Sequence, residues 1–252
     1  MATRVALVGA SGKLGTVIGA VLADLPDFDI VHALGSKGDL SLIADVDLVV
    51  DATTPEVSAD VVRRAADVGV NVLVATSGWS ESRLTEIRAR VEASGIGVVV
   101  IPNFSLGSVL GTAIATVAGR FFDSIEIIES HRDTKIDSPS GTAVRTAELI
   151  QAARTLPVDA PHVDQQARGE QIAGIPVHSL RRPGVIARQD VVLSGPGESL
   201  TITHDTVDSA AAYAPGIRIA ARAAVSARGI IVGLDSFIDL GISAPVLAEG
   251  SE

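Results

Sequence analysis

Short apolar runs alternate with amphipathic segments over the first hundred residues of the chain. The amphipathic segments carry apolar residues at helical spacing, as in Leu14, Val17, Ile18, Val21 and Leu22, and again from Val57 to Val68. The apolar runs lack polar alternation, as expected of strands that are covered on both faces. They lie at residues 5–8, 30–34, 48–50, 70–75 and 98–101. This alternation predicts an α/β fold with a parallel sheet.

The pattern changes after residue 103. We expect a helix over 106–119, a strand over 124–131 and a helix from about Ser140. A stretch rich in Pro, Asp, Gln and Gly over 155–173 predicts a long loop, and strands follow at 175–180, 185–193 and 200–205. A final helix after Pro215-Gly216 has small and apolar residues at helical spacing, so we expect it to pack back on the first half. The second half is therefore predicted to be an open mixed sheet with helices.

A glycine-rich loop joins the first predicted strand to the first predicted helix. It reads Gly9-Ala10-Ser11-Gly12-Lys13-Leu14-Gly15, a GxxGxxG spacing. In this context glycines allow a sharp turn and close approach of a pyrophosphate to a helix N-terminus. We interpret the loop as a dinucleotide site; a plain structural turn is the alternative. In such folds the ligand lies at the carboxyl ends of the strands, which makes Ala75, Thr76, Ser77, Ile101, Pro102, Asn103 and Phe104 candidate walls of the cofactor pocket.

The end of the second predicted strand bears on which dinucleotide is used. It reads Leu34-Gly35-Ser36-Lys37-Gly38, with no carboxylate before Asp39 to bind a ribose hydroxyl of NAD. Ser36 and Lys37, with Lys13, offer a hydroxyl and two ammonium groups to a 2′-phosphate. We therefore expect NADPH to be the preferred cofactor and NADH an alternative one. A solvated turn with a surface lysine is the competing interpretation.

The densest polar stretch of the chain lies between the predicted strand ending at residue 131 and the helix starting near Ser140. His131 and Lys135 are the side chains there most able to deliver a proton near neutral pH. The small Ser140-Gly141-Thr142 at the helix start lets a carboxylate reach unpaired amides. The competing interpretation is a solvated loop followed by a capped helix.

Composition narrows the class of protein. The 252 residues contain no cysteine and carry a net charge of −10. The absence of cysteine excludes disulfides and thiolate metal sites and favours a cytoplasmic protein. The acidic balance argues against nucleic acid, and no apolar run is long enough for a membrane helix. The five histidines show no ligand spacing, so we expect no metal.

Seven stretches together resemble the 4-hydroxy-tetrahydrodipicolinate reductase (dihydrodipicolinate reductase) family of diaminopimelate and lysine biosynthesis. The most specific is EIIESHRDTKIDSPSGTA at 126–143. The others are VALVGASGKLG at 5–15, VVDATTPE at 49–56, ATSGW at 75–79, IPNFSLG at 101–107, GIPVHSLR at 174–181 and LTITHDT at 200–206.

The resemblance implies an N-terminal Rossmann dinucleotide-binding domain over residues 1–103 and 215–252, and an α+β substrate-binding and tetramerisation domain over 104–214. It also implies an NAD(P)H-dependent oxidoreductase and a homotetramer. The reaction expected is hydride transfer to C4 of a cyclic imine dicarboxylate, formed from 4-hydroxy-tetrahydrodipicolinate by loss of water, to give tetrahydrodipicolinate. His131 and Lys135 then form the acid pair, Ser140, Gly141 and Thr142 hold a carboxylate, and the glycine loop with the two pocket walls binds the cofactor.

The chain departs from the family pattern at three places. Arg132 stands where many members have a second histidine, and an arginine can clamp a carboxylate but cannot share proton transfer. Ala75-Thr76-Ser77-Gly78 replaces Gly-Thr-Thr-Gly, and Asp51-Ala52-Thr53 replaces Asp-Phe-Thr. Because of Arg132, an alternative function remains open, namely that of a paralogous NAD(P)H-dependent reductase that acts on another small cyclic imine acid. A catalytically idle dinucleotide-binding regulator is the remaining alternative. Two-domain dehydrogenases that need a nucleophilic cysteine are excluded.

Overall fold

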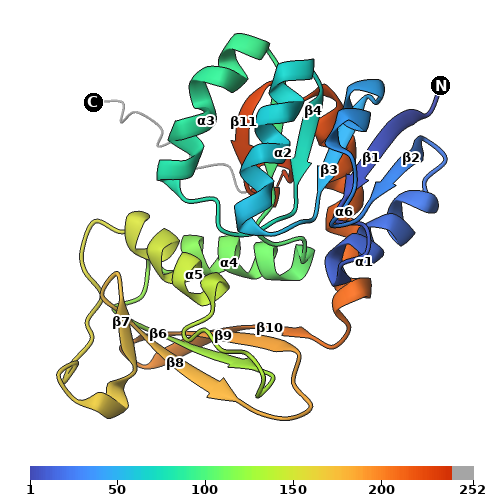
Figure 1. Cartoon of the computed structure of the whole chain (residues 1–252). Coiled ribbons are helices and arrows are strands. Elements are labelled where there is room, and N and C mark those ends of the chain that lie inside the picture. The colour runs from blue at the N-terminus through green and yellow to red at the C-terminus, as the bar shows by residue number, and fades with distance from the viewer. Residues whose placement is uncertain (240–252) are drawn as a thin grey trace.

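The computed structural model describes residues 1–239 and divides them between two sheets, each covered by its own helices (Figure 1). We call these halves the parallel-sheet lobe and the mixed-sheet lobe. The carboxyl ends of the parallel strands face the mixed-sheet lobe, and helices α4 and α5 lie between the two sheets (Figure 1).

The parallel-sheet lobe has the strand order β11-β5-β4-β3-β1-β2, with every neighbouring pair parallel. Its strands are β1 (Thr3–Val8), β2 (Phe28–Leu34), β3 (Leu48–Asp51), β4 (Asn71–Val74), β5 (Gly97–Val100) and β11 (Gly229–Val232). Its helices are α1 (Lys13–Ala23), α2 (Pro55–Val68), α3 (Glu81–Ser94) and α6 (Ser209–Ser226), with 3₁₀ turns η1 (Leu40–Asp45) and η3 (Leu234–Phe237).

Both faces of this sheet are buried, which explains the unbroken apolar runs. Val5 and Leu7 pack with residues of α1 and α6, whereas Ala6 and Val8 pack with residues of α2 and α3. Because alternate side chains of a strand point to opposite faces, a strand between two helical layers needs apolar residues at every position.

The mixed-sheet lobe has the order β10-β9-β6-β8-β7, in which only β6 and β8 run parallel. Its strands are β6 (Ser124–His131), β7 (Glu170–Ile172), β8 (Ile175–Arg181), β9 (Ala187–Gly195) and β10 (Glu198–Thr206). Helices α4 (Leu106–Ala118) and α5 (Gly141–Ala152) cover one face. Ile125, Ile127 and Val191 pack there against Ala143 and Ile150 of α5. No helix within residues 1–239 covers the opposite face (Figure 1).

The predicted fold class, an α/β chain with a parallel sheet and a second mixed sheet, is confirmed. The five predicted parallel strands and the strand over 124–131 are present. The predicted long loop over 155–173 is wrong at its end, because it contains the 3₁₀ turn η2 (Gln166–Arg168) and strand β7, which pairs with β8. Three residues are too few for a periodicity to show, so only the pairing partner defines β7.

The predicted start of the final helix is also wrong. Helix α6 begins at Ser209, where Asp208 accepts hydrogen bonds from the amides of Ala210 and Ala211, and Pro215 lies inside it. Proline and glycine usually mark helix ends, but here packing against α1, β4 and β5 keeps the helix continuous. The expectation that this helix packs back on the first half is correct. Residues 240–252 of the predicted domain lie outside the described residues.

Candidate active site

The glycine loop lies at the switch point of the parallel sheet, where β1 is flanked by β2 on one side and β3 on the other. Gly9 has φ +86°, and a Cβ there would come within 2.3 Å of the Ala52 carbonyl oxygen at the end of β3. A Cβ on Gly15 would come within 2.1 Å of the Gly9 carbonyl oxygen. Gly12 caps α1 without a side chain. The loop is therefore compact, and it presents the first amides of α1 to the crevice in which such sheets bind dinucleotides.

The end of β2 lies beside this loop. The amides of Gly9 and Ala10 both donate to the Leu34 carbonyl, at 2.7 and 3.1 Å. Ser36, Lys37 and Lys13 are all exposed. Asp39 accepts a hydrogen bond of 2.8 Å from the Ser41 amide, which lowers the pKa of Asp39 and makes it the cap of η1. The first carboxylate after β2 is thus engaged with its own 3₁₀ turn.

The two predicted pocket walls follow β4 and β5 at the same carboxyl edge. Four residues of these walls are buried: Ala75, Thr76, Ile101 and Phe104. Only the exposed Ser77 and Pro102 and the half-buried Asn103 can contact a cofactor through their side chains. The remaining residues can offer only backbone atoms.

A buried network below these walls joins the turns after β3 and β4. Asp51 accepts from the Thr53 hydroxyl at 2.6 Å and from the Ser58 hydroxyl, while the Thr53 amide donates to the Thr76 hydroxyl at 2.9 Å. The indole of Trp79 donates to Ser58 at 2.9 Å. The network fixes the wall that contains Ser77.

His131 lies at the last position of β6, on the face covered by α5. Its Nδ1 lies 2.5 Å from Oε2 of Glu129, two residues earlier on the same face of the strand. Glu129 is completely buried, yet it also accepts hydrogen bonds from both terminal nitrogens of Arg181, at 2.9 and 3.0 Å. When His131 donates from Nδ1, its Nε2 is left to face other groups.

The electrostatics of Glu129 reflect this arrangement. Burial raises the pKa of its carboxyl, but the hydrogen bonds from His131 and Arg181 outweigh burial and lower the pKa to about 2. Glu129 is therefore an anion at neutral pH.

Lys135 lies in the loop after β6. Its Nζ donates to both carboxylate oxygens of Asp137, at 2.6 and 2.7 Å, and its side chain is 22% exposed. The same lysine lowers the pKa of Asp137. Because Asp137 is the more exposed partner, an incoming carboxylate can compete with it for the ammonium group.

The start of α5 provides the predicted carboxylate cradle. Ser140 is buried and already engaged, because its amide donates to Glu129 at 3.2 Å and its hydroxyl accepts from the Ala143 amide. Gly141 is exposed and Thr142 half-buried, and no hydrogen bond of their amides occurs within residues 1–239. We therefore define the cradle as the amides of Gly141 and Thr142. Arg132, which directly follows His131 in the chain, is exposed.

Sequence reasoning missed Glu129 and Arg181. Glu129 carried a local signal, because residues two apart on a strand share a face. Arg181 ends the family-like stretch at 174–181, but nothing local linked it to the site, since only the parallel pairing of β6 with β8 places it opposite His131.

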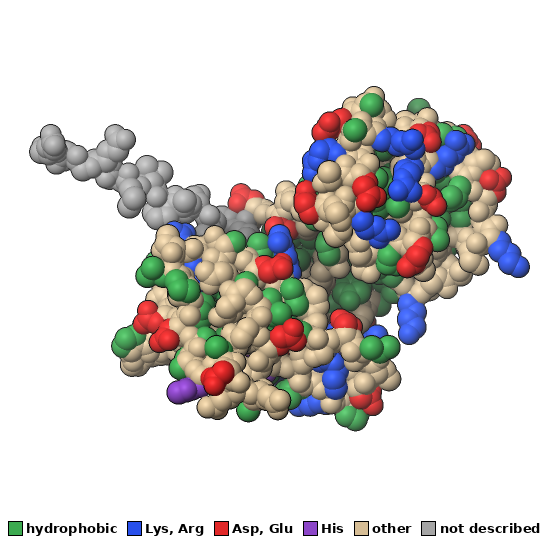
Figure 2. Space-filling view, turned by 60° about the vertical axis from the view of Figure 1, so that its left-hand side comes forward, with side chains coloured by type: hydrophobic (Ala, Val, Ile, Leu, Met, Phe, Trp, Pro, Cys, Tyr) green, Lys and Arg blue, Asp and Glu red, His purple; other side chains and the backbone are tan. Residues whose placement is uncertain are grey.

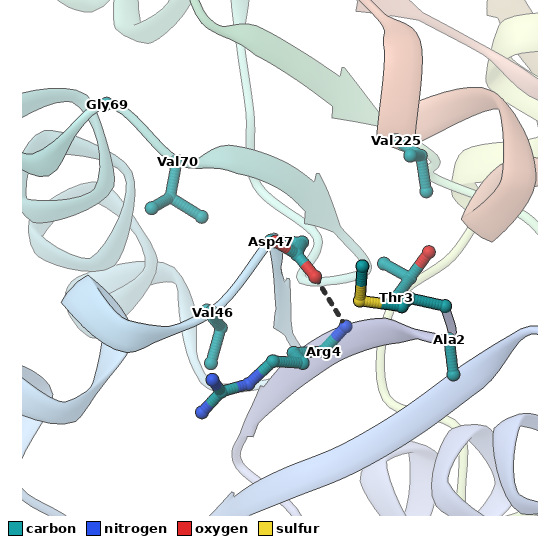
Figure 3. Close-up of a pocket in the computed structure, with 9 residues that line it drawn as sticks. Ala2, Thr3, Arg4, Val46, Asp47, Gly69, Val70 and Val225 are labelled. Carbon is teal, nitrogen blue, oxygen red and sulfur yellow. Dashed lines mark hydrogen bonds between the residues drawn. The ribbon is translucent and has the colours of Figure 1, made fainter.

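The molecular surface is hollowed where the two lobes meet (Figure 2). A separate cavity of about 600 Å³ lies at the opposite, amino-terminal edge of the parallel sheet, lined by Thr3, Arg4, Asp47 and Val70 among others (Figure 3). The Arg4 amide there already donates to Asp47, and its guanidinium pairs with Asp45. We place the candidate site at the carboxyl edge, which faces the mixed-sheet lobe.

No helix within residues 1–239 combines the length and the apolarity needed to cross a membrane. No group of three or more histidine or carboxylate side chains in the same range is arranged to hold a metal ion.

A glycine loop lies at the switch point of a parallel sheet, and the second sheet leads from His131, through the loop that contains Lys135, to a helix N-terminus. This is the architecture of an NAD(P)H-dependent oxidoreductase. The chain matches the family model "Dihydrodipicolinate reductase, N-terminus" over residues 3–104 and the model "Dihydrodipicolinate reductase, C-terminus" over residues 107–238. It belongs to the dihydrodipicolinate reductase family.

Relatives and a solved structure agree with this assignment. The chain is 55% identical over 243 residues to 4-hydroxy-tetrahydrodipicolinate reductase of Clavibacter sepedonicus, covering 95% of this chain and 87% of that one. It is 38% identical to the enzyme of the same name from Streptomyces coelicolor, over 94% and 98% of the two chains. The dipicolinate-bound dihydrodipicolinate reductase from Paenisporosarcina sp. TG-14 superposes with a TM-score of 0.81 at 27% identity, over 94% of this chain and all of that one.

Proposed function

We propose that this protein reduces 4-hydroxy-tetrahydrodipicolinate to tetrahydrodipicolinate, with loss of water, using NAD(P)H. The observation that carries the proposal is the 55% identity to a reductase of this name over nearly the whole chain, together with the acid pair His131 and Lys135. The family likeness and the retained acid pair both disfavour a catalytically idle regulator.

The residues present fit a dinucleotide. Gly9 occupies a cradle that a Cβ would fill. The amides of Lys13 and Leu14 at the start of α1 have no hydrogen-bond partner within residues 1–239, and the helix start offers a partial positive charge to a pyrophosphate. When bound, the nicotinamide supplies a hydride. The exposed Ser36, Lys37 and Lys13 favour NADPH over NADH, since they can bind a 2′-phosphate and the first carboxylate after β2, Asp39, caps its own 3₁₀ turn.

The mixed-sheet lobe supplies the groups for the substrate. The solved relative binds dipicolinate, a ring with two carboxylates, and the cradle at Gly141 and Thr142 offers amides to one carboxylate. Lys135 exchanges Asp137 for a substrate carboxylate, and Arg132 is available for the other. Hydride arrival builds negative charge on the ring, and His131 or Lys135 delivers the compensating proton.

The proposal divides the chain into a cofactor domain over residues 1–103 and 215–252 and a substrate domain over 104–214. The open face of the mixed sheet is the surface for assembly into a homotetramer. Its Glu126 pairs with Arg168 and His178, so this carboxylate already has charged or hydrogen-bonding partners within the chain. We place the enzyme in the cytoplasm, as its cysteine-free sequence favours.

A coupled assay tests the proposal. A synthase generates 4-hydroxy-tetrahydrodipicolinate in situ, and oxidation of NADPH or NADH is followed at the nicotinamide absorbance band. We expect the wild type to oxidise both cofactors only when substrate is present, and the double variant His131→Ala/Lys135→Ala to lose activity while still binding NADPH. A wild type that oxidises neither cofactor, or a double variant as fast as the wild type, overturns the assignment.

A further inference from the structure

We propose that Arg181 is the positioning residue that holds both members of the acid pair in place for catalysis. This inference rests on the proposed function, because it assigns a role within that reaction. Arg181 lies at the end of β8, opposite His131 in the parallel pairing with β6, and its side chain is only 20% exposed.

One guanidinium contacts both sides of the site. Its Nη1 and Nη2 donate to the two carboxylate oxygens of Glu129, at 3.0 and 2.9 Å. Its Nε donates to the Lys135 carbonyl at 3.3 Å, and Nη2 also donates to the Asp137 carbonyl at 2.6 Å. Arg181 therefore binds a buried carboxylate and two backbone carbonyls of the loop that contains Lys135 at once.

Glu129 transmits this constraint to His131 and to the cradle. Its Oε2 accepts from His131, and its Oε1 accepts from the amide of Ser140, the cap of α5. Because Arg181 binds both oxygens, the carboxylate cannot rotate without breaking four hydrogen bonds. The orientation of the imidazole and the position of the helix start both depend on it.

The loop that contains Lys135, which we call the lysine loop, is held on both sides of its tip residue, Ile136. The carbonyls of Lys135 and Asp137 are bound by Arg181, whereas Ile136 between them is 98% exposed. A loop with so exposed a tip has little packing of its own to fix it. Its anchoring to the sheet therefore depends on Arg181.

Only arginine has the geometry for this role. Its planar fork carries five N–H donors in fixed directions, whereas lysine offers one compact ammonium group. Lysine at this position keeps the charge next to Glu129 but cannot reach the carboxylate oxygens and the two loop carbonyls together. Arg181→Lys thus separates charge from positioning.

The test compares Arg181→Lys with Arg154→Lys in the coupled assay. Arg154 is a matched control, because it too donates to backbone carbonyls of a loop, those of Gly119 and Phe122 among them, but lies outside the acid pair and cradle. For Arg181→Lys we expect kcat to fall on the order of 10²-fold, since misplacement of about 1 Å costs this much. The dissociation constant for NADPH is expected to stay unchanged. Arg154→Lys is expected to keep kcat and lose only thermal stability.

A second measurement does not depend on activity. Proton NMR of the ligand-free protein detects the Nδ1 proton of His131, which the hydrogen bond to Glu129 shifts far downfield, with His131→Asn as the assignment control. We expect the signal in the wild type and Arg154→Lys, and its broadening or loss in Arg181→Lys.

The outcomes separate the two proposals. If the wild type has no reductase activity, the proposed function fails, and the NMR signal still decides whether Arg181 orders His131. If the wild type is active and Arg181→Lys retains both its kcat and the His131 signal, the positioning role is wrong.

Discussion

Gly216 of α6 lies directly against the carbonyl of Phe104, so close that a Cβ on Gly216 would come within 2.0 Å of that oxygen. Phe104 leads from β5 into α4, and α6 follows β10, so the contact joins the two connections between the lobes. Both residues are buried. The glycine in Pro215-Gly216 is thus required by backbone packing rather than by a turn.

Gly216→Ala is therefore expected to destabilise the protein by about 1–3 kcal/mol or more, because neither the helix nor the Phe104 backbone can yield cheaply. Thermal melting followed by circular dichroism measures it. Gly111→Ala in α4 is the matched control, since a Cβ there meets only His204 at an ordinary 3.7 Å. The control is expected to be neutral or slightly stabilising. Equal melting temperatures for Gly216→Ala and the wild type would contradict the prediction.

Gly9→Ala is expected to weaken NADPH binding at least ~10-fold, equivalent to about 1.4 kcal/mol. The positive φ and the Ala52 carbonyl at 2.3 Å force the loop to move away from its position at the switch point. Gly12→Ala is the comparison, because its Cβ would lie 3.3 Å from the Gly9 carbonyl oxygen and its φ is −75°. Fluorescence titration with NADPH measures both. A larger loss for Gly12→Ala than for Gly9→Ala would show that the close contact between Gly9 and Ala52 does not control cofactor binding.

Lys37→Ala is expected to raise KM for NADPH about 3- to 10-fold and to leave KM for NADH unchanged, because one exposed charge pair with a phosphate contributes about 1 kcal/mol. Steady-state kinetics with each cofactor in turn provide the measurement. Lys37 and Lys13 are both exposed, so Lys13→Ala tests the second ammonium group in the same way. Unchanged constants for both cofactors in Lys37→Ala would remove it from the cofactor site.

Acid is expected to destabilise the fold through Glu129. Its pKa in the folded protein is about 2, against the usual 4.5. The unfolded chain takes up this proton as the pH falls below about 4.5, while the folded protein resists until about pH 2, so the stabilisation present above pH 4.5 is lost across this window.

Glu129→Gln should lower stability at neutral pH by about 1–3 kcal/mol, since Arg181 loses a charged partner, but should flatten the decline between pH 4.5 and 2. Urea unfolding followed by circular dichroism at a series of pH values measures both effects. If the two proteins lose stability in parallel over this range, the acid sensitivity comes from other carboxylates.

Sequence patterns predicted most elements because their signals are local. The strands that end at Val8 and Val100 are continuous apolar runs, and Ser140 caps its helix as expected. Helix α3 and strand β11 went unassigned. The first has a weak apolar stripe that buries only Leu84, Ile87 and Val91, and the second is defined by its pairing with β5.

The sequence by itself determined the α/β class, the glycine loop and the family, because each depends on residues close together in the chain. It also predicted His131 and Lys135 as the acid pair. The tertiary structure alone decided how these parts are held. Arg181 reaches Glu129 from 52 residues away through the pairing of β8 with β6. Helix α6 continues through Pro215 because the residues after it, such as Ile217 and Ala220, are buried. Contacts between distant segments leave no local periodicity, so only the folded chain places the arginine that binds both sides of the site.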